Sequence, residues 1–213
     1  MKESRFMNAL ILTPYLKEPI CTITEPTRFD LVLCADTAYL AAEAEGITPD
    51  IVIGDFDHGK AEALTNVKNI VRVPCEKDDT DTMLCIKYAI EKGADQLTIL
   101  GGIGGRLDHT FANLQALAYA ESRGISAILK NGRNEAFLTN VPIKIARRDG
   151  WYLSVFAYDR TCEGITLRGT KYEVENVVLD TNFPLGVSNE ITADHAEIDV
   201  KKGRLLIILS KKD

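Results

Sequence analysis

One strand-to-helix turn of the sequence reads Gly101-Gly102-Ile103-Gly104-Gly105-Arg106-Leu107-Asp108-His109. An apolar, strand-like segment (96–100) precedes it, and a helix-like pattern begins at Phe111. Four glycines at such a turn permit backbone conformations closed to other residues, and they let a ligand come close to the main chain. Free amides, a helix N-terminus and the guanidinium of Arg106 would together suit a phosphate. The stretch therefore predicts an α/β unit with an anion site at this turn, and a tight turn with a surface arginine is the alternative.

Two familiar phosphate-binding loops are excluded by spacing. A dinucleotide fingerprint requires a third glycine where Leu107 stands, and a Walker loop requires Lys-Ser or Lys-Thr after its last glycine. Neither pattern occurs anywhere in the chain. The turn must hold its ligand by another scheme.

Strand and helix patterns alternate on both sides of this turn, up to about residue 132. Short buried strands are expected at 9–12 and 31–34, further strands at 51–53, 69–73, 96–100 and 127–130, and helices at 38–45, at 80–92 and from the glycine turn to about 123. In the helix at 80–92, Met83, Ile86 and Ile90 fall on one face. Such alternation is typical of parallel βαβ units whose sheet is covered on both faces. We expect a three-layer α/β/α domain over 1–132.

After residue 132 the periodicity becomes twofold. Residues 151–157 alternate between the two faces of a half-buried strand, and 196–200 repeat the alternation. Lys201 to Arg204 then lead into the apolar run 205–209, which predicts a hairpin. We expect a smaller antiparallel sandwich or barrel over 133–213.

Composition excludes several classes of protein. The chain has 213 residues, 46% of them hydrophobic and 26% charged, as in an ordinary globular protein. A formal net charge of -6 argues against nucleic-acid and acidic-membrane partners. The five cysteines are widely spaced and form no Cys-x-x-Cys pair, so we expect buried, reduced thiols instead of disulfides or a zinc site. The apolar segment 6–12 is too short to span a membrane, and a cytoplasmic location is expected.

Two acidic clusters stand at the ends of predicted strands, where open α/β sheets place their ligands. They are Asp50-Ile-Val-Ile-Gly54-Asp55-Phe-Asp57 and Lys77-Asp78-Asp79-Thr80-Asp81. In the first, a turn at Gly54 would let Asp55 and Asp57 point the same way. Carboxylates this close repel one another unless a cation lies between them, and hard oxygen ligands suit Mg²⁺. For the second cluster, helix capping and dipole compensation stay open as the alternative.

Asp108 and His109 suggest acid–base chemistry, although Asp108 could equally cap the following helix and His109 could hydrogen-bond the loop. His58 and His195 lack metal-ligand spacing and are expected to be structural or exposed. A phosphate-binding turn, acidic metal sites and no Walker loop together indicate Mg²⁺-dependent nucleotide chemistry.

Five motifs occur in a fixed order along nearly the whole chain. They are Ala35-Asp36, Pro49-Asp50 to Asp57, Lys77-Asp78-x-Thr80-Asp81, Gly104 to His109 with Asn113, and Gly186-Val187-Ser188-Asn189-Glu190. In these motifs the chain resembles the thiamine pyrophosphokinase family. The resemblance implies an α/β domain followed by a β-sandwich. It also implies transfer of a diphosphate from ATP to the hydroxyethyl group of thiamine, with release of AMP.

The resemblance also implies residue roles. Asp55, Asp57 and Asp78 would hold Mg²⁺, and Lys77, Thr80 and Asp81 would position the polyphosphate. The nucleotide and the reaction centre would be lined by Asp36, Gly104, Gly105, Arg106, Asp108, His109 and Asn113, with Asp108 a candidate proton acceptor. Ser188 and Asn189 would hydrogen-bond the aminopyrimidine of thiamine, and Tyr172 would stack on it. Family members are homodimers, so the site would be shared between the α/β domain of one subunit and the sandwich of the other.

Two positions depart from the family pattern. Thr37-Ala38 stand where family members often have Gly-Gly, and His58 stands where serine is common. Bulk at Thr37 would crowd a nucleotide beside Asp36. Two other functions are compatible with the same clusters: a Mg²⁺-dependent phosphohydrolase, and a non-catalytic protein that binds a nucleotide or thiamine.

Overall fold

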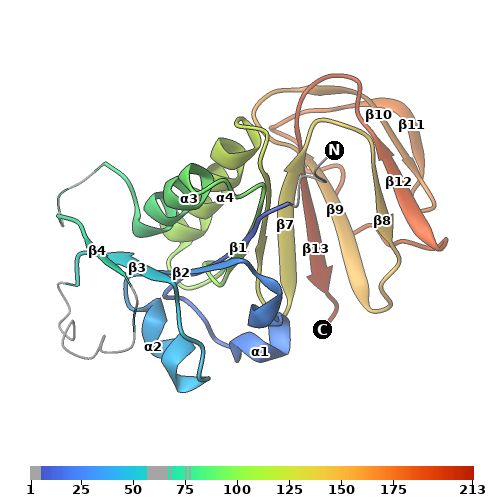
Figure 1. Ribbon diagram of the computed structural model, residues 1–213. Helices are drawn as coiled ribbons and strands as arrows, with labels where there is room; N and C mark the ends of the chain where they lie inside the picture. Colours follow the sequence, from blue (N-terminus) through green and yellow to red (C-terminus); the bar gives the residue numbers. More distant parts are fainter. Residues whose placement is uncertain (1–5, 57–66, 68, 75, 77) are drawn as a thin grey trace, which may run out of the picture. The chain divides into compact units, whose positions relative to one another are not determined.

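A computed structural model describes residues 6–56, 67, 69–74, 76 and 78–213 (Figure 1). The chain divides into two compact units, Met1–Gly132 (unit 1) and Arg133–Asp213 (unit 2). Within the described part, no helix has both the length and the apolar character needed to cross a bilayer.

Unit 1 is built on a parallel sheet with the strand order β4-β3-β2-β1-β5-β6 (Figure 1). The strands are β1 (Asn8–Leu12), β2 (Leu31–Ala35), β3 (Ile51–Gly54), β4 (Ile70–Arg72), β5 (Gln96–Leu100) and β6 (Ser126–Lys130). The helices are α1 (Ile20–Ile23), α2 (Ala38–Ala44), α3 (Asp81–Glu91) and α4 (Leu107–Glu121), with a short 3-10 turn at Pro26–Arg28. Helices α3 and α4 lie on one face of the sheet and α1 and α2 on the other. The predicted three-layer α/β/α arrangement is confirmed.

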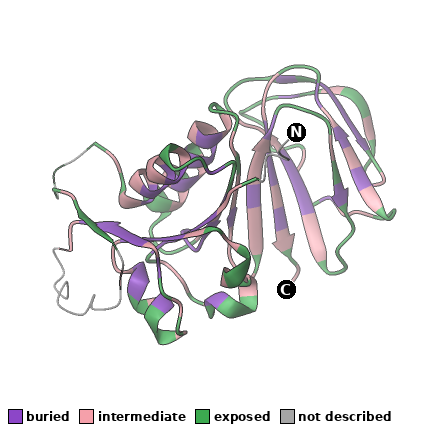
Figure 2. Cartoon of the chain, in the orientation of Figure 1, coloured by how far each residue is buried: buried purple, intermediate pink, exposed green. Residues whose placement is uncertain are grey.

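Burial explains why the inner strands show no alternation. All four residues of β3 are buried, as are the last four of β1 and of β2 (Figure 2). Helices cover both faces, so side chains pointing either way lie in a core. Leu10, Val32 and Tyr39, for example, belong to the cluster beneath α1 and α2. Strand β4 lies at the edge of the sheet, and its three residues are exposed.

Helix α3 (Asp81–Glu91) forms within the range predicted for it. Its buried residues are Thr82, Cys85, Ile86 and Ala89, whereas Met83 and Ile90 are only partly covered. Of the three apolar residues that share a face of the helix, only Ile86 is fully buried. Small side chains such as those of Cys85 and Ala89 are readily buried and let a helix lie close to its sheet, so the bulkiest residues need not mark the contact.

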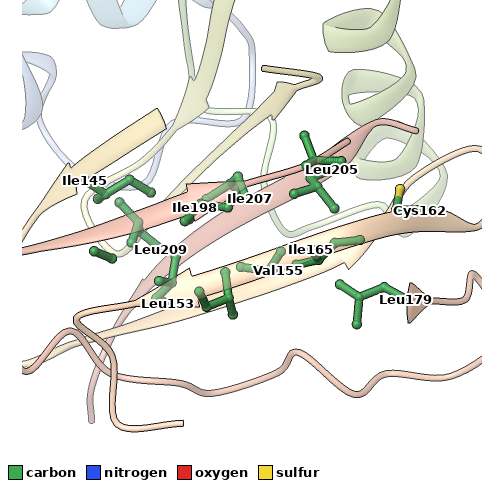
Figure 3. Close-up of a cluster of buried hydrophobic side chains, with 13 residues drawn as sticks. Ile145, Leu153, Val155, Cys162, Ile165, Leu179, Ile198, Leu205, Ile207 and Leu209 are labelled. Carbon is green, nitrogen blue, oxygen red and sulfur yellow. The ribbon is translucent and has the colours of Figure 1, made fainter. Parts of the chain in front are cut away.

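Unit 2 is a β-sandwich. Its strands are β7 (Asn134–Thr139), β8 (Ile143–Ala146), β9 (Trp151–Ala157), β10 (Cys162–Arg168), β11 (Val174–Leu179), β12 (His195–Asp199) and β13 (Leu205–Lys211). One antiparallel sheet has the order β7-β13-β9 and the other β11-β10-β12-β8. Figure 3 shows their shared core, to which Val155 and Ile207 contribute from the first sheet and Ile165 and Ile198 from the second.

The predicted hairpin at the end of the chain is wrong. Strand β12 pairs with β10 and β8, whereas β13 pairs with β7 and β9. Residues 200–204 thus cross from one sheet to the other. Alternation marks which side chains of a strand face the core, but the two sheets of a sandwich face the same core, so the pattern does not select the pairing partner.

The cysteines follow the prediction with one exception. Cys34, Cys85 and Cys162 are buried free thiols, and burial raises the pKa of Cys34 to about 12. Cys21, also free, is exposed, so the expectation of burial is wrong there. Cys75 lies outside the described residues.

Candidate functional site

A cavity of about 370 Å³ lies in unit 1 where three parallel strands end. Thr13, Asp36 and Gly101 are the first residues after β1, β2 and β5. The lining residues are Thr13, Pro14, Tyr15, Asp36, Thr80, Asp81, Thr82, Gly102, Gly104, Arg106, His109 and Asn113. Seven of them were predicted as site residues: Asp36, Thr80, Asp81, Gly104, Arg106, His109 and Asn113.

The strand order explains why the cavity is here. From β1 the chain builds the sheet outward through β2, β3 and β4, and it then returns to the other side of β1 with β5 and β6. The connections after β1 and β5 therefore diverge, which leaves a crevice at the carboxyl ends of these neighbouring strands. Open α/β sheets bind their ligands at such a switch point.

Asp36 is held at the edge of the crevice by its backbone. Its φ is +45°, a left-handed conformation that aspartate tolerates better than most residues. The Asp36 amide donates to the carbonyl of Ile53 at 2.8 Å. A Cβ on Gly54 would lie 2.8 Å from the Asp36 Cα, so glycine is needed for this approach. Gly54 therefore serves close packing at the end of β3, not the turn that was predicted.

Thr37, beside Asp36, is the N-cap of α2, with an ordinary φ of -71°. Thr37 is not among the described residues that line the cavity. Its added bulk therefore lies outside that lining, and its conformation does not require glycine.

The glycine loop (Gly101–Arg106) differs from the predicted cradle of free amides. The amides of Gly101, Gly102 and Gly104 donate to the Lys130 carbonyl, the Tyr15 carbonyl and the Thr110 hydroxyl at 2.9, 3.1 and 3.1 Å. The expectation of free amides is therefore wrong for these three. Gly101 and Gly102 are buried, and buried amides need partners within the protein.

The glycines instead make room for other parts of the protein. Gly104 and Gly105 have φ of +93° and +65°, and a Cβ on Gly105 would lie 2.5 Å from the Tyr15 ring. A Cβ on Gly102 would collide with the Asn113 amide, which donates to the Gly102 carbonyl at 3.0 Å. The loop is thus packed against Tyr15 on one side and Asn113 on the other.

Arg106 and Asp108 form a two-pronged ion pair. Arg106 donates from Nη2 and Nε to the two Asp108 oxygens at 2.6 and 3.1 Å. Asp108 also accepts the His109 amide at 2.9 Å in the first turn of α4, whose N-cap is Arg106. The hydrogen bond from Arg106 lowers the pKa of Asp108. A carboxylate with a lowered pKa is a weaker base, so the pairing reduces the capacity of Asp108 to accept a proton.

The segment before α3 contains polar residues that stabilise the local fold and polar residues that line the cavity. Thr80 caps α3 by accepting the Met83 amide at 3.2 Å, and it also lines the cavity with Asp81. Asp79 pairs with Lys87 at 2.6 Å, whereas Asp78 is exposed. The alternative of helix capping is therefore correct for Thr80, which does not remove it from the cavity.

The predicted metal ligands are only partly described. Asp55 directly follows β3, and Asp57, His58 and Lys77 lie outside the described residues. Among the residues that the structure describes, no three Asp, Glu, His or Cys side chains lie together as a metal site. Asp50, from the same motif, is at the opposite end of β3, where its Oδ2 accepts the Val32 amide at 3.0 Å.

The sequence analysis did not identify the cavity-lining residues that directly follow β1. Thr13, Pro14 and Tyr15 line the cavity, and the buried Thr13 hydroxyl donates to the Leu100 carbonyl at 3.1 Å. Their position directly after a predicted buried strand was the available signal, because ligands bind at such ends. Their side chains belong to no charged cluster or motif, and so nothing singled them out.

In unit 2 the predicted thiamine residues differ in their surroundings. Ser188 is exposed, with a φ of +58°, and Tyr172 is 61% exposed. Asn189 is 5% exposed, and its Oδ1 accepts the amides of Tyr172 and Glu190 at 3.0 and 2.8 Å. Its Nδ2 donates to the Tyr172 carbonyl at 2.9 Å. Asn189 thus fixes the Tyr172 main chain, and its oxygen already accepts two hydrogen bonds.

An open parallel sheet with a polar cavity at its switch point, followed in the chain by a β-sandwich, defines the class of α/β proteins that bind a small ligand at strand ends. Two family models match the chain in the same order. "Thiamin pyrophosphokinase, catalytic domain" matches residues 26–129, and "Thiamin pyrophosphokinase, vitamin B1 binding domain" matches residues 140–205. The chain belongs to the thiamin pyrophosphokinase family.

Individual relatives agree with this assignment. The thiamine pyrophosphokinase of Bacillus subtilis is 28% identical over 171 residues, which cover 78% of this chain and 80% of the relative. Thiamin pyrophosphokinase 1 of Caenorhabditis elegans is 24% identical and covers 75% and 68% of the two chains. The crystal structure of the Bacillus subtilis enzyme has a TM-score of 0.84 at 25% identity, over 97% of this chain and 99% of that one. Yeast thiamin pyrophosphokinase shares the fold, with a TM-score of 0.81 at 16% identity over 99% and 88% of the chains.

Proposed function

We propose that this chain transfers the diphosphate group of ATP to thiamine, forming thiamine diphosphate and AMP. One observation carries the proposal: the cavity at the switch point of unit 1 gathers seven residues that the family motifs select, within the span of the catalytic-domain match. The vitamin B1 binding match falls in unit 2, which supports a thiamine-binding role for that unit.

In this proposal the cavity holds the polyphosphate of ATP. Arg106 supplies the positive charge, and Thr80 and Asp81 stand at the N-terminus of α3, an end of a helix that favours anions. Arg106 would exchange its bond to Asp108 for bonds to phosphate oxygens, for which its planar donors are suited. Asn113 and Tyr15 would keep the glycine loop in shape while the ligand binds.

Mg²⁺ would be held by Asp55, Asp57 and Asp78. Asp55 stands at the end of a strand beside the Asp36 backbone, and Asp78 is exposed just before α3. Carboxylate oxygens in such positions suit an ion that keeps some waters and shares its shell with phosphates. When bound, Mg²⁺ would offset the charge on the phosphates during transfer.

The proposed transfer forms one bond to phosphorus and breaks one. The hydroxyl oxygen of thiamine bonds to the β-phosphorus, the bond from that phosphorus to the oxygen bridging to the α-phosphate breaks, and AMP departs. The hydroxyl proton is released as the new bond forms. Because so little covalent chemistry falls to the protein, the lining residues act by placing the two substrates and by stabilising charge.

Thiamine would bind through Ser188 and the ring of Tyr172 in unit 2, with Asn189 holding Tyr172 in place. A homodimer that joins unit 1 of one subunit to unit 2 of its partner, and a cytoplasmic location, belong to the same proposal. Size measurement in solution tests the dimer. A mixture of Arg106→Ala and Ser188→Ala subunits should then recover part of the activity that each variant has lost.

The decisive test is to incubate the protein with ATP, Mg²⁺ and thiamine and to follow both products. We expect thiamine diphosphate and AMP in equal amounts. Formation of ADP, or absence of thiamine diphosphate, would contradict the proposal. Phosphate release that does not depend on thiamine would instead identify a phosphohydrolase, and tight binding without turnover would identify a non-catalytic binding protein.

Strand β3 offers a matched pair of variants for the metal site. Asp55→Asn, at the carboxyl end, should abolish Mg²⁺-dependent turnover while the protein stays folded. Asp50→Asn, at the amino end, should keep turnover, because an asparagine oxygen can still accept the Val32 amide. Equal loss of turnover in both variants would remove Asp55 from the site.

A further inference from the structure

Asp79 occupies the one position of the motif 77–81 to which the family resemblance assigns no role. It lies between Asp78 and Thr80, in a stretch that forms neither helix nor strand. Its carboxylate accepts two bonds from the Lys87 ammonium, at 2.9 and 2.6 Å. Lys87 is eight residues further along, well inside α3, so the pair ties an irregular segment to a regular helix.

Lys87 is itself held against the neighbouring helix. Its Nζ lies 5.7 Å from the centroid of the Tyr119 ring of α4. The guanidinium of Arg123 stacks on the same ring at 3.5 Å. Helices α3 and α4 lie side by side, and α4 begins at the end of the glycine loop (Figure 1). Lys87 thus contacts a residue from each of the two segments whose ends border the cavity.

We propose that Asp79 and Lys87 form a brace that fixes the 78–81 segment in its ligand-binding conformation, and that Lys87 is a positioning residue for the Mg²⁺–nucleotide complex. The inference rests on the proposed function, because Asp78 and Thr80 have ligand roles only there. Ordering an irregular segment costs conformational entropy, and a segment ordered beforehand binds its ligand at lower cost. The brace does this without touching the ligand.

Lys87 keeps its positive charge in the neutral range. The hydrogen bond that Lys87 donates to the Asp79 carboxylate raises the pKa of Lys87, so this ammonium does not lose its charge near neutral pH. The side chains of Lys87 and Asp79 are 37% and 31% exposed, so water screens the pair and its effect on overall stability should be small. The brace should therefore show itself in ligand binding more than in unfolding.

The test uses Lys87→Met and Asp79→Asn in the full chain, with Lys87→Arg as the conservative variant. Lys92→Met is the control, because Lys92 caps the same helix but contacts Tyr88. We expect both uncharged variants to raise the Mg²⁺ concentration for half-maximal activity and the KM for ATP by roughly 10-fold. The KM for thiamine and the kcat should change little. Lys87→Arg should restore most of the loss, and the double variant should be no worse than either single one.

Three results would overturn the brace. The first is an unchanged Mg²⁺ requirement and an unchanged KM for ATP, and the second is an equal rise in the KM for thiamine. The third is a double variant whose rise in the KM for ATP is the product of the rises in the two single variants. Calorimetric titration of Mg²⁺–ATP without thiamine separates the brace from the proposed function. If the wild type binds Mg²⁺–ATP but makes no thiamine diphosphate, the proposed function fails, while weaker binding by Lys87→Met still supports the brace. If the wild type does not bind Mg²⁺–ATP, both fail.

Discussion

Each unit places one buried asparagine behind a loop that was predicted to bind a substrate. Asn113 in unit 1 and Asn189 in unit 2 are 6% and 5% exposed. Asn113 donates to the Gly102 carbonyl and also lines the cavity. Asn189 makes three hydrogen bonds with its side chain, two of them to the main chain of Tyr172. Asn113 therefore belongs both to the loop and to the cavity, whereas Asn189 acts through the residue that it holds.

This difference separates two ways in which a motif residue serves a site. A side chain with unused hydrogen-bonding capacity at a cavity wall binds the ligand directly. A side chain whose acceptor already receives two amides has its capacity spent on the fold, and it reaches the ligand only by fixing a neighbour. The same residue type at the same burial thus predicts different consequences of mutation.

The largest effect is expected from Asn189→Ala. Removing the side chain leaves the amides of Tyr172 and Glu190 without their acceptor, which should lower the free energy of unfolding by about 2–4 kcal/mol. Urea denaturation measures this loss. The KM for thiamine should rise as well, because Tyr172 is released.

Ser188→Ala is the matched control. Ser188 is exposed, and the hydrogen bond to Ser154 uses its main-chain amide, which the variant retains. Its stability should stay within about 0.5 kcal/mol of wild type. If Ser188→Ala destabilised the protein as much as Asn189→Ala, the distinction between a holding residue and a contacting residue would be lost.

Gly105→Ala tests the packing of the glycine loop against Tyr15. The substitution combines a φ of +65° with a clash at the Tyr15 ring, and we expect a loss of about 1–3 kcal/mol in the free energy of unfolding together with a higher KM for ATP. Gly124→Ala isolates the backbone cost, since Gly124 has a φ of +75° with nothing within 4 Å of the added Cβ. The difference in the free energy of unfolding between the two variants measures the cost of the clash. Adding Tyr15→Ala to Gly105→Ala should relieve that clash. No relief would mean that Tyr15 does not shape the loop.

Asn113→Ala should have a smaller effect on stability, of about 1 kcal/mol, because the variant loses the hydrogen bond to the Gly102 carbonyl without stranding two main-chain amides. Its kinetic effect should fall on ATP alone, since Asn113 lines the cavity of unit 1. Steady-state assays that vary each substrate in turn make the comparison. An equal rise in the KM for thiamine would place Asn113 with Asn189, as a residue that supports the fold generally.

The sequence predicted the architecture well because burial periodicity is a local property. Unbroken apolar strands such as β3 require two covered faces, and the alternation at 151–157 requires one. Strand pairing is not local, which is why β12 and β13 were joined in a hairpin although they lie in opposite sheets. Cavity residues were found where charge or glycine clusters marked them, as at Asp36 and Arg106.

What the sequence could not supply was the partner of each polar group. The glycine amides were expected to face a ligand, but they bond to Lys130, Tyr15 and Thr110. Those partners come from β6, from the segment after β1 and from α4, and only the folded chain brings them together. Tyr15 was overlooked for the same reason, since its importance comes from the space above Gly104 and Gly105 and not from its own neighbours in sequence.

The smallest effect is expected from acid titration of the Arg106–Asp108 pair. The pKa of Asp108 is lowered in the folded state, so the pair contributes to stability at neutral pH and loses that contribution as the pH falls through the lowered pKa. Asp108→Asn should lower the unfolding midpoint slightly near neutral pH, and the difference from wild type should disappear below about pH 4, where Asp108 itself takes up a proton. The pair is exposed, with side-chain exposures of 72% and 64%, which keeps the change small.

The ion pair between Asp159 and Arg204 in unit 2 provides the comparison. Its side chains are 27% and 20% exposed and 2.7 Å apart. Burial is the largest single influence on the pKa of Asp159 and raises it, but the hydrogen bond and charge of Arg204 and the charge of Arg160 together outweigh burial, so the pKa is lowered. Asp159→Asn should therefore flatten the acid limb of the unfolding midpoint more than Asp108→Asn does, because the shielded pair is less screened by water. A larger change from Asp108→Asn would show that Arg106 is firmly committed to Asp108, and it would count against the exchange of partners that ATP binding requires of Arg106.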